Sequence, residues 1–161
     1  MSSTQMFRVY IKATPEQIWQ AITDPDWTQR YGYKGRTEYE LHAGGAVVGH
    51  ATKEMIAMGA PAIMVKGEVR EADAPKRLVH TFHAQFNEET IAEPGVIVTY
   101  TIEPDDHGLT SLTIVNDENN SPITMGFLAG QPTHLQEGGG GFPWIISDLK
   151  TLLETGKSLE S

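Results

Sequence analysis

The residue in this sequence best suited to chemistry is His80. It falls in the predicted strand Arg77–Phe86, where apolar side chains alternate and define an inward face. His80 belongs to that inward set, whereas His83 falls on the opposite face. An imidazole among apolar side chains can orient a bound molecule or move a proton. The alternative is a core histidine whose ring nitrogens find hydrogen-bond partners, and the sequence leaves both interpretations open.

The same alternation in other predicted strands places a few more polar side chains among apolar ones. The strand Thr37–Leu41 directs Tyr39 and Leu41 inward, and a later strand directs Tyr100 inward. His50 lies in a strand without a clear phase and is assigned to neither face. Apolar walls with a few polar groups are typical of small-molecule sites, although each polar group could instead be satisfied within the core. The candidate ligand-binding residues are Tyr39, His50, Val65, His80, Phe82, Tyr100, Asn116 and Trp144.

Other kinds of chemistry find little support in the residue pattern. The chain has no cysteine, which removes thiol nucleophiles and cysteine metal sites. His80 and His83 fall on opposite faces of their strand, and no other histidine pair has the spacing of metal ligands. Neither glycine cluster is followed by the Lys-Ser/Thr pair of a phosphate loop. We therefore predict no metal, no cofactor and no catalytic residue, and an enzymatic role is less expected than binding.

Composition limits the partners of the protein. Twelve basic and 21 acidic residues give a net charge of −9, and no basic cluster is present, so nucleic acid is not an expected partner. The first residues lack a signal-peptide pattern, and no apolar run is long enough to cross a membrane. We expect a cytoplasmic protein without membrane insertion. A length of 161 residues predicts one domain over residues 1–161.

The elements that must position these residues form a particular order. A strand over Met6–Lys12 is followed by a capping box at Thr14 and Gln17 and by a second short helix after Asp24. Apolar residues at helical spacing predict a long final helix over Pro143–Thr155. The fold class is thus α+β, with about seven antiparallel strands and with the helices gathered on one face. The six strands after the short helices are Thr37–Leu41, Ala46–Lys53, Met64–Glu71, Arg77–Phe86, Gly95–Glu103 and Leu109–Asn116.

Two apolar connections are unusual. Residues 55–64 are rich in methionine and broken by Gly59 and Pro61, and residues 122–128 carry further apolar side chains. Methionine suits surfaces that accept varied apolar partners, and exposed apolar segments mark binding sites or interfaces. We predict two loops that gate a ligand site. The alternatives are a homodimer contact through both loops, or burial of both in the core.

Several local motifs, and the order in which they follow one another along the chain, resemble those of the helix-grip superfamily known as SRPBCC. This superfamily includes START lipid-transfer domains and birch-pollen-allergen-like proteins. Within it the chain is most similar to the family named for the activator of the heat-shock-protein-ninety ATPase. The motifs are Ala13–Trp19, Leu41–Gly45, Gly67–Val69, Pro75–Val79, Gly108–Thr113, and Trp144 with Leu149, Leu152 and Leu153. The chain departs from the family at His42 and Ala43, at Asn116, and in the apolar connection 55–64.

The resemblance implies a helix-grip fold with a cavity between the sheet and the final helix. It also implies three functions. The first is binding of a small hydrophobic, aromatic or lipid-like ligand. The second is a polyketide cyclase or aromatase activity, with His80 or Tyr100 as acid or base. The third is a co-chaperone-like interaction module, which would make a chaperone the partner. The shared motifs are caps, turns and core positions, so they do not choose among these functions.

Overall fold

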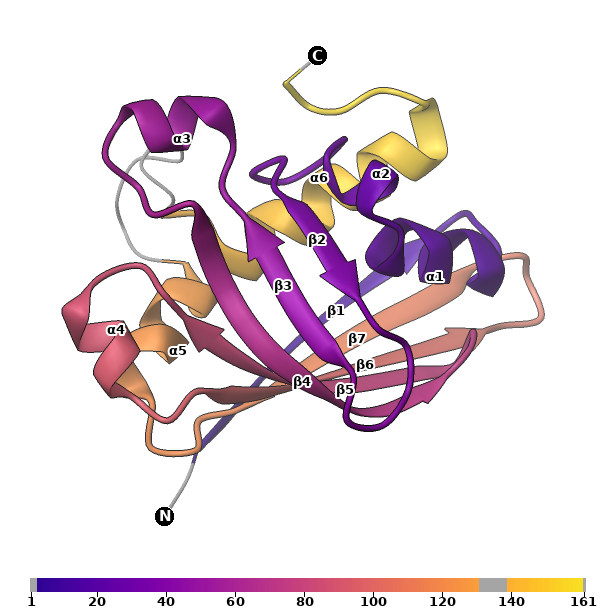
Figure 1. The fold of residues 1–161 in the computed structure, drawn as a ribbon. Coiled ribbons are helices and arrows are strands. Elements are labelled where there is room, and N and C mark those ends of the chain that lie inside the picture. Colours follow the sequence, from indigo (N-terminus) through magenta and orange to yellow (C-terminus); the bar gives the residue numbers. More distant parts are fainter. Residues whose placement is uncertain (1–2, 131–138, 161) are drawn as a thin grey trace.

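A seven-stranded antiparallel sheet forms the frame of the protein. The structure is a computed structural model, and it describes residues 3–130 and 139–160. The strand order is β1-β7-β6-β5-β4-β3-β2, so β1 and β2 are the two edges and the sheet curves between them (Figure 1). The strands are β1 Thr4–Ile11, β2 Arg36–Tyr39, β3 Ala46–His50, β4 Ile63–Asp73, β5 Arg77–Ala84, β6 Val96–Pro104 and β7 Thr110–Asp117. This confirms the predicted α+β class and helix-grip architecture.

Two short helices follow β1, as predicted. Helix α1 spans Pro15–Thr23, and its capping box joins Thr14 and Gln17 in both directions. Helix α2 spans Pro25–Thr28, where the side chain of Asp24 accepts a hydrogen bond from the Asp26 amide. Both caps were visible in the sequence because each precedes a proline at a first helical position.

The long final helix α6 spans Gly141–Thr155, so it begins two residues before the predicted Pro143. It ends at Gly156, whose φ of 82° is the left-handed conformation that glycine adopts without strain. Its main contacts are with β1, α5 and α1. The helix therefore lies over one side of the sheet and does not pack closely on β2, β3 and β4.

Both predicted apolar loops contain helices, which corrects the sequence-based prediction. Helix α5 spans Pro122–Ala129, and helix α3 spans Lys53–Ala57, so strand β3 ends at His50 and not at Lys53. The side chain of Thr52 caps α3 by accepting a hydrogen bond from the Met55 amide. A further short helix, α4 Glu88–Ala92, begins with a capping box that the sequence analysis missed.

The inward faces of the central strands were predicted correctly. The buried residues include Leu78 and His80 on β5, Val98 and Tyr100 on β6, and Asn116 on β7. The prediction for Leu41 was wrong: it lies past the end of β2 and is 42% exposed. The chain turns at this residue, because the His42 amide donates to the Glu40 carbonyl oxygen and closes a tight turn around Leu41.

Candidate ligand cavity

A cavity of about 640 Å³ lies between the sheet and α6. It exists because α6 packs toward β1 and leaves the β2–β4 side of the sheet uncovered. Its walls are mainly aliphatic and aromatic side chains. From the sheet they include Val47, Val65 and Phe82, and from α6 they include Phe142 and Ile146. Such a volume and lining are typical of small-molecule sites.

The cavity reaches the surface beside α3. Met58 lines the cavity and is 83% exposed, and Gly59 next to it is also exposed. Met55 and Met64 line the same region from either side of this turn. Because methionine side chains are flexible and polarisable, this mouth can adapt to apolar molecules of different shapes.

Three aromatic rings from three strands form the polar part of the cavity. His80 lies between Tyr39 and Tyr100, with ring centroids 5.5 Å from Tyr39 in an edge-on arrangement and 5.8 Å from Tyr100 in a stacked one. The register explains this grouping. Val98 of β6 pairs with His80 of β5, and Tyr100 follows two residues later on the same face. Strand register therefore brings His80 and Tyr100 together, and the curvature of the sheet brings Tyr39 of the edge strand β2 to them.

The protonation state of His80 follows from its contacts. Its Nδ1 lies 2.8 Å from the carbonyl oxygen of Thr81, and because a carbonyl only accepts, Nδ1 carries the proton. The other nitrogen, Nε2, then holds a lone pair. Burial lowers the pKa of His80 to about 4, although the hydrogen bond to Thr81 opposes this shift. At neutral pH, His80 is an uncharged acceptor.

The tyrosines around the cavity are held in their neutral forms. Burial raises the pKa of Tyr39 to about 12, while its interaction with the Tyr100 side chain lowers it. Burial raises the pKa of Tyr100 well above its ordinary value, and the neighbouring tyrosines add to this rise. Tyr31 has a raised pKa for the same reason, and its hydroxyl donates to the carbonyl oxygen of Ala21 at 2.8 Å. Neutral phenols and a neutral imidazole favour hydrogen bonding over proton transfer near pH 7.

Charge is almost absent from the cavity. Among the described lining residues there is no aspartate, glutamate or arginine, and Lys34 carries the one ammonium group. Lys34 makes no ion pair within the described part of the chain, and its φ of 64° is unusual for a residue other than glycine. This contrasts with the net charge of −9 of the whole chain. Two carboxylates lie just behind the wall, since Asp148 accepts a hydrogen bond from the amide of the lining residue Gly32 and Glu38 contacts the lining residue His50.

The candidate residues from the sequence do not all meet at this cavity. Six of them line it, namely Tyr39, His50, Val65, His80, Phe82 and Tyr100. Asn116 and Trp144 are not among its lining residues. Asn116 is buried on β7 and donates through Nδ2 to Oε1 of Gln5 at 2.8 Å. Trp144 is half-buried, and the α6 residues that line the cavity are its neighbours along the helix, including Ile145 and Ile146.

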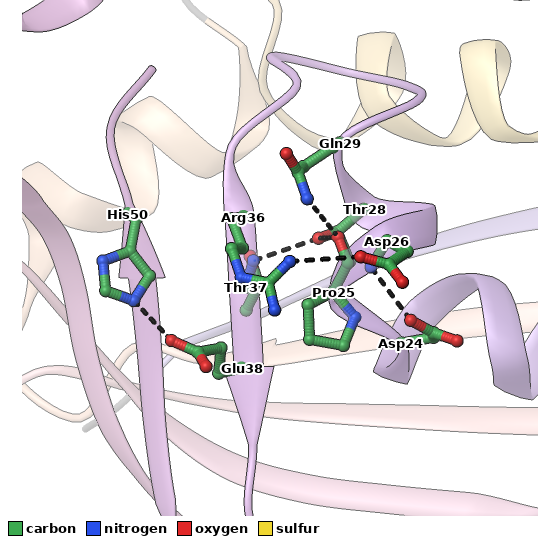
Figure 2. Close-up of polar contacts among 9 residues, drawn as sticks. All are labelled: Asp24, Pro25, Asp26, Thr28, Gln29, Arg36, Thr37, Glu38 and His50. Carbon is green, nitrogen blue, oxygen red and sulfur yellow. Dashed lines mark hydrogen bonds and ion pairs between the residues drawn. The ribbon is translucent and has the colours of Figure 1, made fainter. Parts of the chain in front are cut away.

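His50 lines the cavity, but its ring is engaged at the outer side of the sheet. Its Nε2 lies 2.6 Å from Oε1 of Glu38 on the neighbouring edge strand β2 (Figure 2). Strand β2 lies between β3 and α2 in this view, and its Arg36 side chain pairs with Asp26 of α2 at 3.2 Å. Both pairs are well exposed and add little to stability.

Sequence reasoning missed two lining residues of consequence. Tyr31 lies after α2 in an irregular segment, where neither a strand nor a helix period can assign a face. Phe142 precedes Pro143, from which the helix was predicted to start, so the predicted apolar face of the helix did not include it. Phe142 is buried and packs against Tyr100, with ring centroids 6.4 Å apart.

Residues 3–130 and 139–160 lack two further kinds of feature. In these ranges, no three histidine, aspartate or glutamate side chains lie close enough together to hold a metal ion. None of the helices in the described residues has the length and apolar character that a membrane span requires.

A curved antiparallel sheet, two short helices after the first strand and a long helix over the cavity define a helix-grip protein. The family model described as "Activator of Hsp90 ATPase homolog 1-like protein" matches residues 12–154, and the chain belongs to that family. Comparison with curated proteins finds no match.

Three solved structures illustrate the shared fold. CalU16 from Micromonospora echinospora is 17% identical with a TM-score of 0.63, covering 96% of this chain and 78% of its own. The Aha1 dimer from Colwellia psychrerythraea is 17% identical with a TM-score of 0.65, covering 97% and 99%. PFC0360w, an HSP90 activator from Plasmodium falciparum, is 18% identical with a TM-score of 0.55, covering 98% and 91%. At these identities the similarity establishes the fold alone.

Proposed function

We propose that this protein binds a small hydrophobic or aromatic molecule in the cavity between the sheet and α6. The observation that carries the proposal is the cavity itself, about 640 Å³ of apolar space with a few inward polar groups. Domains with closely packed interiors contain few voids larger than a water molecule. This cavity is far larger than a water molecule and opens beside α3, so a bound molecule can enter and fill it.

The electrostatics of the cavity favour binding over catalysis. The pKa of His80 is lowered to about 4, so its lone pair is a weak base at neutral pH. The raised pKa values of Tyr39 and Tyr100 make both phenols weak acids. The cyclase or aromatase alternative needs one of these groups to exchange a proton efficiently, and the burial that surrounds them opposes this.

A matched pair of bulky substitutions tests the proposal. Val65 lines the cavity from β4, whereas Val79 lies on the outer face of β5. We expect Val65→Trp to fill cavity space and to weaken binding of 2-naphthol at least tenfold in isothermal titration calorimetry. Val79→Trp should leave the affinity unchanged. Equal affinities in both variants, or no heat of binding in the wild type, would contradict the proposal.

A second candidate function is contact with an Hsp90-type chaperone. It is favoured by the description of the matching family and by the printed name of the Plasmodium relative as an HSP90 activator. The same comparison includes a dimeric Aha1, so a homodimer belongs to this candidate as well. Adding the protein to a purified Hsp90 should then raise its ATPase rate. An unchanged rate at saturating protein would count against this function and would not affect the ligand proposal.

A further inference from the structure

One buried hydrogen-bond acceptor in the cavity wall lacks a donor. His80 is 2% exposed, its Nδ1 donates to the Thr81 carbonyl, and its Nε2 has no partner within the described residues. Buried polar atoms are nearly always paired, because leaving one unpaired forfeits its hydration without replacement. The unpaired Nε2 therefore calls for an explanation.

A second unpaired acceptor helps to interpret the first. The Oδ1 atom of Asn116 also lacks a partner within the described residues. His80 and Asn116 lie in one row across the sheet, since Val98 pairs with both of them. Only His80 of the two lines the cavity. A molecule in the cavity can thus reach the surroundings of His80 but not those of Asn116.

We propose that His80 Nε2 accepts a hydrogen bond from a hydroxyl or N–H group of the ligand, which is therefore an apolar aromatic or alicyclic molecule bearing a neutral donor. This inference rests on the proposed function, because it assumes that the cavity is occupied by a ligand. An ionised carboxylate has no proton to offer Nε2. A cationic ligand would meet Lys34 and no carboxylate among the described lining residues.

Of the two tyrosine rings that contact the His80 imidazole, Tyr39 is the one better able to move. The Tyr39 ring meets the imidazole edge-on at 5.5 Å, and the Tyr39 side chain is half-buried beside the cavity. It is carried by β2, an edge strand of four residues. Tyr100 is less able to move, because it is buried on a central strand and packs on Phe142. The ligand donor therefore reaches Nε2 as the Tyr39 ring turns aside.

Two probes test the inference, and they differ in whether the naphthyl oxygen carries a hydrogen or a methyl group. 2-Naphthol offers a hydroxyl donor, and 2-methoxynaphthalene keeps the oxygen and the rings without the donor. We expect wild-type protein to bind 2-naphthol about tenfold more tightly than 2-methoxynaphthalene, the effect of one net hydrogen bond. Comparable binding of the two probes would overturn the donor inference and leave the proposed function standing. Binding of neither probe would overturn the proposed function itself.

A matched pair of variants locates the effect. His80→Phe keeps an aromatic ring and removes the acceptor, and we expect the preference for 2-naphthol to disappear while 2-methoxynaphthalene binds as before. His83→Phe makes the same change on the opposite face of β5, where His83 contacts the Ile91 carbonyl at 2.9 Å, and should keep the preference. A preference that survives in His80→Phe would overturn the assignment.

The wild-type protein allows a test that does not depend on the folding of either variant. In a long-range ¹H–¹⁵N spectrum of the histidine rings, 2-naphthol should move the His80 Nε2 signal toward lower frequency, as acceptance of a hydrogen bond does. The signal of His83, on the opposite face of β5, serves as the internal reference. An unmoved His80 signal at saturating 2-naphthol would contradict the inference.

Discussion

The β1 side and the β2–β4 side of the sheet differ in how closely they are packed. On one side, α6 packs against β1, and Leu152 is 4% exposed and lies outside the cavity lining. On the other side, strands β2, β3 and β4 face the cavity, and α3 at its mouth has no buried residue. Met58 there is 83% exposed. A single helix cannot cover a strongly curved sheet evenly, so close packing on one side leaves space on the other.

Different residues therefore carry the stability of the fold and the binding of a ligand. Residues of the packed side hold the fold by excluding water from apolar surface. Residues of the open side contribute less to stability and are free to contact a ligand. The following variants test that separation.

The largest effect is expected in the packed core. Leu152 is buried on α6 and does not line the cavity, so Leu152→Ala leaves a new void that its neighbours cannot easily fill. We expect the free energy of unfolding to fall by about 2–5 kcal/mol, measured by urea denaturation. A loss below about 1 kcal/mol would mean that the packed side is looser than described.

The next effect is a pH dependence that originates at His80. Because its pKa is lowered to about 4 in the folded protein, the unfolded chain takes up a proton at higher pH than the folded one. The free energy of unfolding therefore falls by about 3 kcal/mol through His80 as the pH falls from about 6.5 to about 4. Urea denaturation at both pH values checks this. His80→Phe should lose this part of the pH dependence, whereas His83→Phe should retain it.

A smaller effect distinguishes two helix caps of the same type. Thr14 caps α1, which buries four residues including Ile18 and Ile22, and Thr52 caps α3, which buries none. Each threonine hydroxyl accepts a hydrogen bond from a backbone amide at 3.2 Å. We expect Thr14→Ala to cost about 1 kcal/mol of global stability and Thr52→Ala clearly less, because α3 can unfold locally. Equal costs would indicate that α3 is coupled to the core.

The smallest effect on stability is expected at the mouth. Met58→Ala should change the free energy of unfolding by less than about 0.5 kcal/mol, because the side chain is already largely in water. It should nevertheless weaken 2-naphthol binding in calorimetry, since Met58 lines the cavity. A large loss of stability with unchanged affinity would reverse the assigned roles.

Prediction from sequence succeeded where apolar residues repeat regularly along a whole element or where a local capping motif is present. The strand of Val98 and Tyr100 alternates over its full length, and the caps at Thr14 and Asp24 are local signals, so both were predicted correctly. Strand β3 is five residues long and shifts register at His50, which removed the alternation needed to orient that residue.

The helices in the two apolar connections were missed for a different reason. In α5 the apolar residues do not gather on one face, so no helical period stands out. Its start is fixed by Glu93, far away in sequence, which accepts hydrogen bonds from the amides of Ile123 and Thr124 at 2.8 and 2.9 Å. A tertiary cap of this kind leaves no local pattern.

The position of Asn116 and Trp144 relative to the cavity depends on the same missing information. Strand phase correctly predicted that Asn116 is buried, but which part of a buried face borders empty space depends on where α6 lies. That placement follows from the contacts of α6 with β1 and α5. Secondary structure alone does not contain these contacts.

The most direct test of the account uses the methionine methyl groups as reporters. Met55, Met58 and Met64 line the cavity, whereas Met6 is 58% exposed on β1 and Met125 is buried on α5 outside the lining. In ¹³C-methyl-methionine NMR spectra, titration with 2-naphthol should shift the signals of the three cavity methionines and leave those of Met6 and Met125 in place. Shifts confined to Met6, or no shifts at saturating 2-naphthol, would contradict a ligand cavity between the sheet and α6.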